Sequence, residues 1–83
     1  MPQQLIDPSQ IRAARALLEL SQADLADLSG VGIATIKRLE SAPDVLRITA
    51  GVLLRVQMAL EEAGIEFIFE DETKGSGVRR RLR

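Results

Sequence analysis

The sequence predicts a mainly α-helical domain of four to five helices that ends in a pair of β-strands. Apolar residues recur at helical spacing through the first 64 residues, whereas from residue 65 they alternate with polar residues. Hydrophobic residues make up 46% of the chain but only two are aromatic, so the core is expected to be aliphatic. We therefore expect a helical domain over residues 7–64 and a strand extension over residues 65–83.

The first helix is expected over residues 8–20. Asp7 is a favourable cap, Pro8 suits the first helical position, and Gln10 stands where a capping box places its second member. Residues 1–6 show no clear pattern and are expected to form a loose lead-in. Four apolar residues at helical spacing are expected to face the core: Ile11, Ala14, Leu17 and Leu18.

Two short helices joined by a tight turn are expected over residues 22–28 and 33–41. Ser21 and Asp24 repeat the capping signature, and Gly30 suits the positive φ that ends a helix. Pro43 is expected to stop the second of these helices, because the residue before a proline disfavours helical geometry. In this second helix Ile36 and Leu39 are predicted to face inward, which leaves four residues outside: Ile33, Ala34, Lys37 and Arg38.

A fourth helix, capped by Thr49 and ended by Gly64, is expected to close the bundle. Residues 44–48 are too apolar for an exposed loop, so we expect a partly buried connection before it. Its core face is predicted to carry four apolar residues: Leu53, Val56, Leu60 and Ala63.

Two strands are expected after the fourth helix, over residues 65–70 and 78–82. Antiparallel pairing would place glutamates opposite arginines, at about 0.2–1 kcal/mol per pair. A two-stranded hairpin needs support, so Phe67 and Phe69 are expected either to pack on the fourth helix or to join strands from two copies.

Residues 21–41, SQADLADLSGVGIATIKRLES, resemble the Cro/repressor-type, or XRE-like, helix-turn-helix regulators. The C-terminal patterns ALEEAGIEFI and GVRRRL also resemble the tail of small bacterial members of that family. This resemblance implies a lambda-repressor-like bundle whose partner is double-stranded DNA. The matching residues of the central motif are Ser21, Gln22, Leu25, Ala26, Gly30, Val31, Thr35, Ile36, Leu39 and Glu40.

The resemblance also implies roles for individual residues. The third helix would lie in the major groove with Ile33, Ala34, Lys37 and Arg38 toward the bases, while Gln22 and Thr35 would support phosphate contacts. For each of these six residues, the alternative interpretation is an ordinary side chain that is solvated or packs against its neighbours. Arg15 and Glu40 match positions that form an internal ion pair, which would fix the angle of the third helix.

The strand extension is the predicted site of homodimerisation. Chains this short often gain stability by pairing with a second copy. The arginines of residues 79–81 and 83 either pair with the acidic block of residues 61–72 or neutralise phosphates. The residues expected in the dimer contact are Phe67, Phe69, Val78, Arg80 and Leu82.

Composition excludes several classes of function. The chain has neither cysteine nor histidine, which removes disulfides, thiol nucleophiles, imidazole bases and the usual zinc ligands. We expect no enzyme activity, no catalytic residues, no metal and no cofactor. No segment resembles a signal peptide or a membrane span, so a cytoplasmic location is expected.

The net charge of −1 and an apolar Ile33 also favour an alternative function. The chain would then be an adaptor or antitoxin-like module that binds a protein partner.

Overall fold

The structure is a computed structural model that describes residues 5–41 and 49–82. Within these ranges the chain forms four helices and one antiparallel hairpin, which confirms the predicted mainly α fold with a C-terminal strand pair. The predicted buried connection at residues 44–48 and the stop at Pro43 lie outside the described residues. The elements are α1 (Pro8–Leu18), α2 (Gln22–Ser29), α3 (Ile33–Ser41), α4 (Ala50–Glu62), β1 (Ile65–Ile68) and β2 (Gly77–Arg80).

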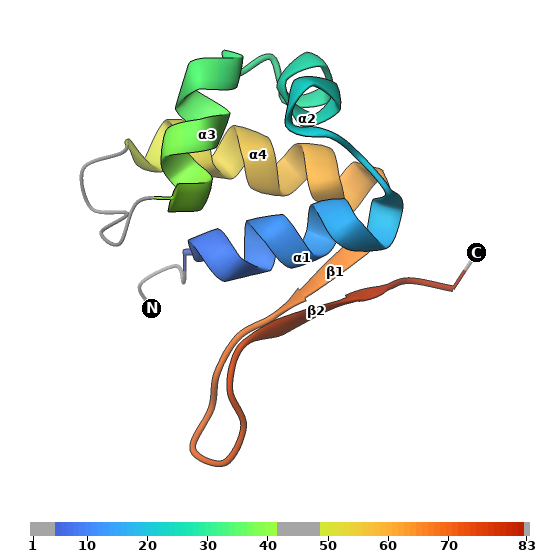
Figure 1. The fold of residues 1–83 in the computed structure, drawn as a ribbon. Helices are drawn as coiled ribbons and strands as arrows, with labels where there is room; N and C mark the ends of the chain where they lie inside the picture. The colour runs from blue at the N-terminus through green and yellow to red at the C-terminus, as the bar shows by residue number, and fades with distance from the viewer. Residues whose placement is uncertain (1–4, 42–48, 83) are drawn as a thin grey trace.

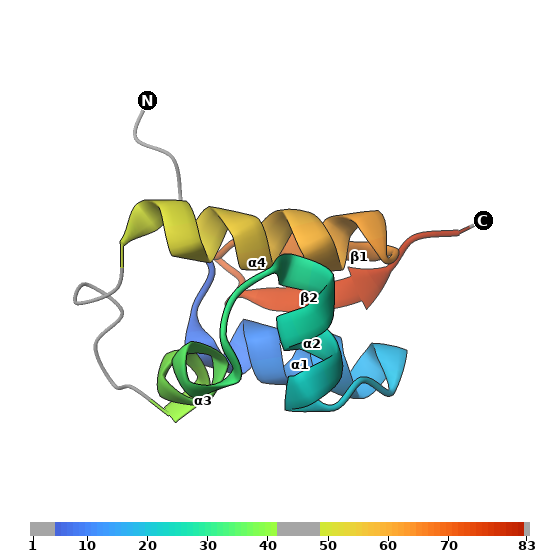
Figure 2. The same ribbon diagram turned by 90° about the horizontal axis from the view of Figure 1, so that it is seen from above.

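The elements stack in three layers. Helices α1 and α4 lie in the middle, α2 and α3 cover one side of them, and the hairpin lies on the other side (Figures 1 and 2). The hairpin packs through β2 against α1 and through β1 against α4. The helix pair that carries the candidate site is therefore on the side of the domain opposite the hairpin.

One hydrophobic core joins the helices and the hairpin. Ile65 and Phe67 of β1 are buried together with side chains from all four helices. Ile6 is also fully buried, so the expected loose lead-in is wrong at this residue, which carried no periodic signal in the sequence. The buried core residues are Ile6, Ile11, Ala14, Leu25, Val31, Ile36, Leu39, Leu53, Val56, Leu60, Ile65 and Phe67.

Two residues expected in the core lie outside it. Leu17 is 38% exposed and Ala63 is exposed, because both stand at helix ends where the packed face turns away from the core. Helix α1 also ends two residues earlier than expected. Glu19 adopts a left-handed conformation with φ 56°, and the amide of Leu20 bonds the carbonyl of Arg15 at 2.9 Å. This is the closing pattern usually made by glycine, so the sequence offered no sign of it.

The hairpin pairs β1 with β2 inside one chain. Glu66 lies opposite Arg79, and Arg79 Nη2 contacts Glu66 Oε2 at 2.6 Å on the exposed face, which confirms the predicted pairing of opposite charges. Both strands are shorter than expected. Residues 69–70 and 81–82 lie beyond the paired strands, although the amide of Arg81 still donates to the carbonyl oxygen of Gly64 at 2.8 Å.

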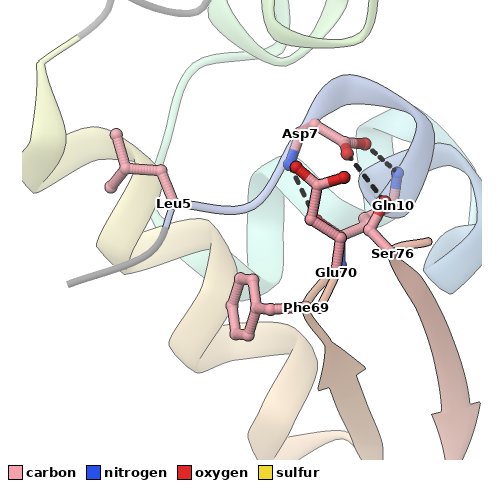
Figure 3. A pocket seen from close by; sticks show the side chains of 6 residues that line it. All are labelled: Leu5, Asp7, Gln10, Phe69, Glu70 and Ser76. Atoms are coloured by element: carbon pink, nitrogen blue, oxygen red, sulfur yellow. Dashed lines mark hydrogen bonds between the residues drawn. The ribbon is translucent and has the colours of Figure 1, made fainter. Parts of the chain in front are cut away.

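Gln10 connects the start of α1 to both strands. Its side chain is 2% exposed, and Nε2 donates to the carbonyl oxygens of Ile68 at 2.9 Å and Gly77 at 3.0 Å. Its Oε1 accepts from the amide of Asp7 at 2.9 Å, while Ser76 Oγ donates to Asp7 Oδ2 at 3.1 Å (Figure 3). The two residues of one capping box thus cap the start of α1 and anchor the hairpin to it.

The arginine run anchors the other end of the hairpin. Arg80 Nη2 donates to the carbonyl oxygen of Leu17 at 2.5 Å, in the last turn of α1. Arg81 Nη2 donates to the carbonyl oxygen of Glu61 near the end of α4. A cation is favourable at a helix C-terminus, where the last carbonyls have no partner within the helix. Together with Arg79, all three arginines of the run at residues 79–81 contact other parts of the domain.

Candidate nucleic-acid interface

Local hydrogen bonds fix both the start of α2 and the turn that joins it to α3, where the amide of Val31 donates to Ser29 Oγ at 3.2 Å. Ser21 Oγ accepts from the amide of Asp24 at 3.0 Å, and Asp24 Oδ2 accepts from the amide of Ser21 at 2.9 Å. Gly30 ends α2 with φ 72° and bonds the carbonyl of Ala26 at 3.0 Å. Val31, 6% exposed, then fills the angle between the two helices. The predicted cap and turn are both confirmed.

The outward face of α3 carries four exposed side chains. Ile33 is 42% exposed, and Ala34, Lys37 and Arg38 are exposed as well, whereas Thr35 is half-buried. Ile36 and Leu39 anchor the opposite side of the helix in the core. The first turn of this face is therefore apolar and its second turn is basic.

The structure brings Arg15 of α1 together with Glu40 of α3. Arg15 Nε lies 2.6 Å from Glu40 Oε2, and Arg15 Nη2 lies 2.7 Å from Glu40 Oε1. Glu40 is 4% exposed, and its hydrogen bond to Arg15 raises the pKa of the guanidinium further above its ordinary value, although burial opposes this. Arg12 also donates a hydrogen bond to the carbonyl oxygen of Glu40 and holds the same turn. The sequence did not predict this contact. The C-terminal end of α3 is thus fixed from α1.

Gln22, matched to a phosphate-binding position by the family resemblance, is turned toward this ion pair. Its Nε2 donates to Glu40 Oε1 at 3.2 Å, and the side chain is half-buried. The structure therefore places Gln22 with Arg15 and Glu40 rather than with the exposed residues of α3.

Charge around α2 and α3 is divided between the two helices. Asp24 and Asp27 are exposed on α2, whereas Lys37 and Arg38 are exposed on α3. The backbone amide of Ser21 and, to a smaller extent, its hydroxyl donate hydrogen bonds to Asp24. These bonds lower the pKa of Asp24 below its usual value, so this carboxylate stays ionised at neutral pH. An approaching phosphate backbone would be attracted to α3 and repelled from the first turn of α2.

A shallow groove of about 510 Å³ separates α2 from the start of α3. Ile33 lies at its edge, and Leu28, 55% exposed, is a further large apolar side chain of α2 that the sequence pattern did not single out. Gly32 directly precedes α3 and offers no side chain, although its carbonyl accepts from the amide of Ile36 at 3.0 Å. The residues that line the groove are Ala23, Ala26, Asp27, Gly30, Val31, Gly32 and Ile33.

The residues expected in a dimer contact have different environments. Phe67 is buried in the core of its own chain, and Phe69 and Val78 are packed against that core. Arg80 donates to the Leu17 carbonyl, and Leu82 is fully exposed. Phe67 therefore contributes to the fold of one chain.

Other kinds of site find little support in the described ranges. Across residues 5–41 and 49–82, no cluster of three or more His, Cys, Asp or Glu side chains has the arrangement of a metal site. None of the helices in this part of the chain is long and apolar enough to cross a membrane. A depression of about 260 Å³ beside Asp7 and Glu70 is open and polar (Figure 3).

Comparison with known proteins agrees with this geometry. The helix-turn-helix family matches residues 11–62, which include α1 from Ile11 onward, the turn between α2 and α3, and α4. The match covers more than half of the chain. No curated protein matches the sequence significantly. The fold, the geometry of the α2–α3 turn and this match together show that the chain belongs to the Cro/repressor-type helix-turn-helix family, a family of DNA-binding regulators.

Proposed function

We propose that the chain is a sequence-specific transcriptional regulator in the cytoplasm that binds double-stranded DNA as a homodimer and inserts α3 into the major groove. The observation that carries this proposal is the outward face of α3, whose four exposed side chains stand on a helix fixed at its far end by Arg15 and Glu40. A reading helix must keep its angle for base contacts to form in register.

Arg38 is the proposed reader of a guanine. A guanidinium can donate to O6 and N7 of guanine together, and such a pair discriminates by about 1–3 kcal/mol. Lys37, one residue earlier, is placed to contact a base or a neighbouring phosphate, with Thr35 in support. Ile33 and Ala34 offer only apolar contact, which suits a thymine methyl group.

A mobility-shift titration of the DNA upstream of its own reading frame, across a salt series, tests the proposal. Arg38→Ala should weaken binding roughly 5- to 150-fold, corresponding to about 1–3 kcal/mol. Lys37→Ala should reduce the salt slope by about one if Lys37 contacts a phosphate. Arg79→Ala is the matched control, because Arg79 pairs with Glu66 on the hairpin and lies away from α3. Equal binding by the Arg38 and Arg79 variants would contradict the proposed role of α3.

A second candidate function is binding of a protein partner at the groove between α2 and α3. Ile33 favours it, because it is a large apolar side chain exposed at this groove, and exposed apolar surface is typical of protein contacts. Leu28 is a second exposed apolar side chain on α2, outside the lining of the groove. Recovery of a stoichiometric partner that Ile33→Asp abolishes, without any DNA binding by the wild-type chain, would decide for this function.

A further inference from the structure

The outer face of α4 is apolar and exposed. Leu54 is 40% exposed and Met58 is 50% exposed, one helical turn apart. The opposite face of the helix carries the buried core residues Leu53, Val56 and Leu60. Helix α4 is therefore apolar on two sides, and only one of them is used by the fold.

Leu5 enlarges this surface. It is 41% exposed and lines, with the first two turns of α4, a groove of about 130 Å³. The groove is lined mainly by apolar side chains and glycine. We refer to the surface formed by Leu5, Gly51, Leu54 and Met58 as the α4 face.

Charged residues stand before and after Met58 along α4, beside the α4 face. Arg55 lies three residues before Met58 and Glu62 four residues after it, and both are exposed. At 100° per residue these positions lie within about 60° of Met58 around the helix. Across the described ranges neither residue forms an ion pair. A positive charge thus stands one turn before Met58 and a negative charge one turn after it, on the same side of the helix.

We propose that the α4 face binds the α4 face of a second copy of the chain, with the two helices antiparallel. A two-fold axis between residues 58 and 59 places Arg55 of one copy opposite Glu62 of the other, and the symmetry repeats this contact. Met58 then lies at the centre against the second copy. The arrangement brings the apolar side chains together and pairs both charges, whereas parallel packing would place like charges side by side.

The same axis suits the proposed DNA-binding dimer. It lies between the two copies, perpendicular to α4 and along the direction in which the three layers stack, so the α2–α3 layers of both copies lie toward one end of the axis and both hairpins toward the other (Figures 1 and 2). Two α3 helices on one side of the dimer can enter successive major grooves of the same DNA segment. The inference rests on the proposed homodimer, but its test uses no DNA.

The hairpin is a poorer interface. Antiparallel pairing of two β2 strands would place the arginines of residues 79–81 near those of the other copy, and like charges across a strand pair are destabilising. Phe67 is also already buried within its own chain. The charges at the α4 face are complementary instead.

The dimer should be weak in the absence of DNA. A helix of 13 residues is about 20 Å long, and a single helix pair of this length buries less than the roughly 1,200 Å² of stable interfaces. The dimer is favoured once both copies bind one operator.

Sedimentation of the full chain over a concentration series tests the proposal. Met58→Glu should leave the chain monomeric across the series, because it places charge at the centre of the interface. Leu28→Glu is the matched control, since Leu28 has similar exposure on α2, and it should associate like the wild type. A monomeric wild-type chain, or dimers that persist in Met58→Glu, would overturn the proposal.

A charge exchange provides the second measurement. Arg55→Glu and Glu62→Arg should each weaken association about tenfold, and the double variant should restore it, because the opposite charges meet again with their signs exchanged. A general effect on folding would not be reversed in this way. Failure of the double variant to recover association would place the contact elsewhere and refute the antiparallel arrangement. Loss of DNA binding in a chain that still dimerises would instead count against the proposed function alone.

Discussion

The guanidinium of Arg15 holds the carboxylate of Glu40 through two hydrogen bonds, of 2.6 and 2.7 Å, between α1 and the last turn of α3. Glu40 is 4% exposed, while the side chain of Arg15 is 21% exposed. A third donor, Nε2 of Gln22, reaches the same carboxylate at 3.2 Å. The charge of Glu40 is therefore compensated inside the domain.

Replacement of Arg15 should be strongly destabilising. Arg15→Met leaves the buried carboxylate of Glu40 without its charge partner, which costs about 3–5 kcal/mol in comparable buried pairs. Arg79→Met breaks an exposed pair of similar geometry and should cost less than about 1 kcal/mol. Urea unfolding at neutral pH measures both values. Similar losses in the two variants would show that Glu40 is solvated in solution.

Gln10 should be as important to the hairpin as to α1. Gln10→Leu keeps a similar volume but removes the donor to Ile68 and Gly77 and the acceptor for Asp7, so we expect a loss of about 2–4 kcal/mol. Thermal unfolding gives the total effect, and amide hydrogen exchange of β1 and β2 locates it. Unchanged exchange in the strands would mean that Gln10 does not anchor the hairpin.

Asp7 should make the fold sensitive to acid. Burial alone would raise the pKa of its carboxyl, but hydrogen bonds from Ser9, Gln10 and Ser76 outweigh this and lower the pKa below the ordinary value of 3.8. Because the folded pKa is the lower one, the stabilisation is present above pH 3.8 and is lost as the pH falls through the folded pKa.

The comparison of wild type with Asp7→Asn isolates this effect. The urea midpoint of the wild type should exceed that of the variant at pH 7, and the difference should shrink below about pH 4. Ser76→Ala should raise the pKa of Asp7, as followed by NMR of its carboxyl carbon. A difference that stays constant down to pH 2 would rule out the carboxylate as its source.

Ile33 should detect a thymine methyl group. Once an operator is selected, substitution of one thymine at a time by deoxyuridine removes only the methyl group and should weaken wild-type binding about fourfold at the contacted position. Ile33→Ala should bind more weakly but no longer distinguish the two bases there. Lys37→Ala should retain the discrimination. An Ile33→Ala variant with undiminished preference for thymine would remove this contact.

Much of the helical part could be predicted from the sequence because its signals are local. The caps at Asp7, Ser21 and Thr49 and the turn at Gly30 depend on residues within a few positions of each other, and all four are present in the structure. The start of α3 at Ile33 could be predicted for the same reason.

Long-range contacts of polar side chains could not be predicted in the same way. The hydrogen bonds of Gln10 span 58 and 67 residues of sequence, and nothing in the pattern distinguishes this glutamine from an ordinary capping residue. Arg80 and Arg81 are predicted from the sequence to pair with the acidic block or to neutralise phosphates, but backbone carbonyls at the ends of two helices supply their acceptors. The family resemblance suggested the partner of Arg15, whereas periodicity alone gives no such information.

The position of α1 couples two distant surfaces of the molecule. Through Gln10 and Leu17 it contacts the hairpin, and through Arg15 it contacts α3. By thermodynamic linkage, a ligand that binds the hairpin and displaces α1 would change the affinity for DNA, and DNA would change the affinity for that ligand by the same factor. Under the proposed function, the hairpin is then a place from which the affinity of α3 for DNA can be adjusted without any contact to α3.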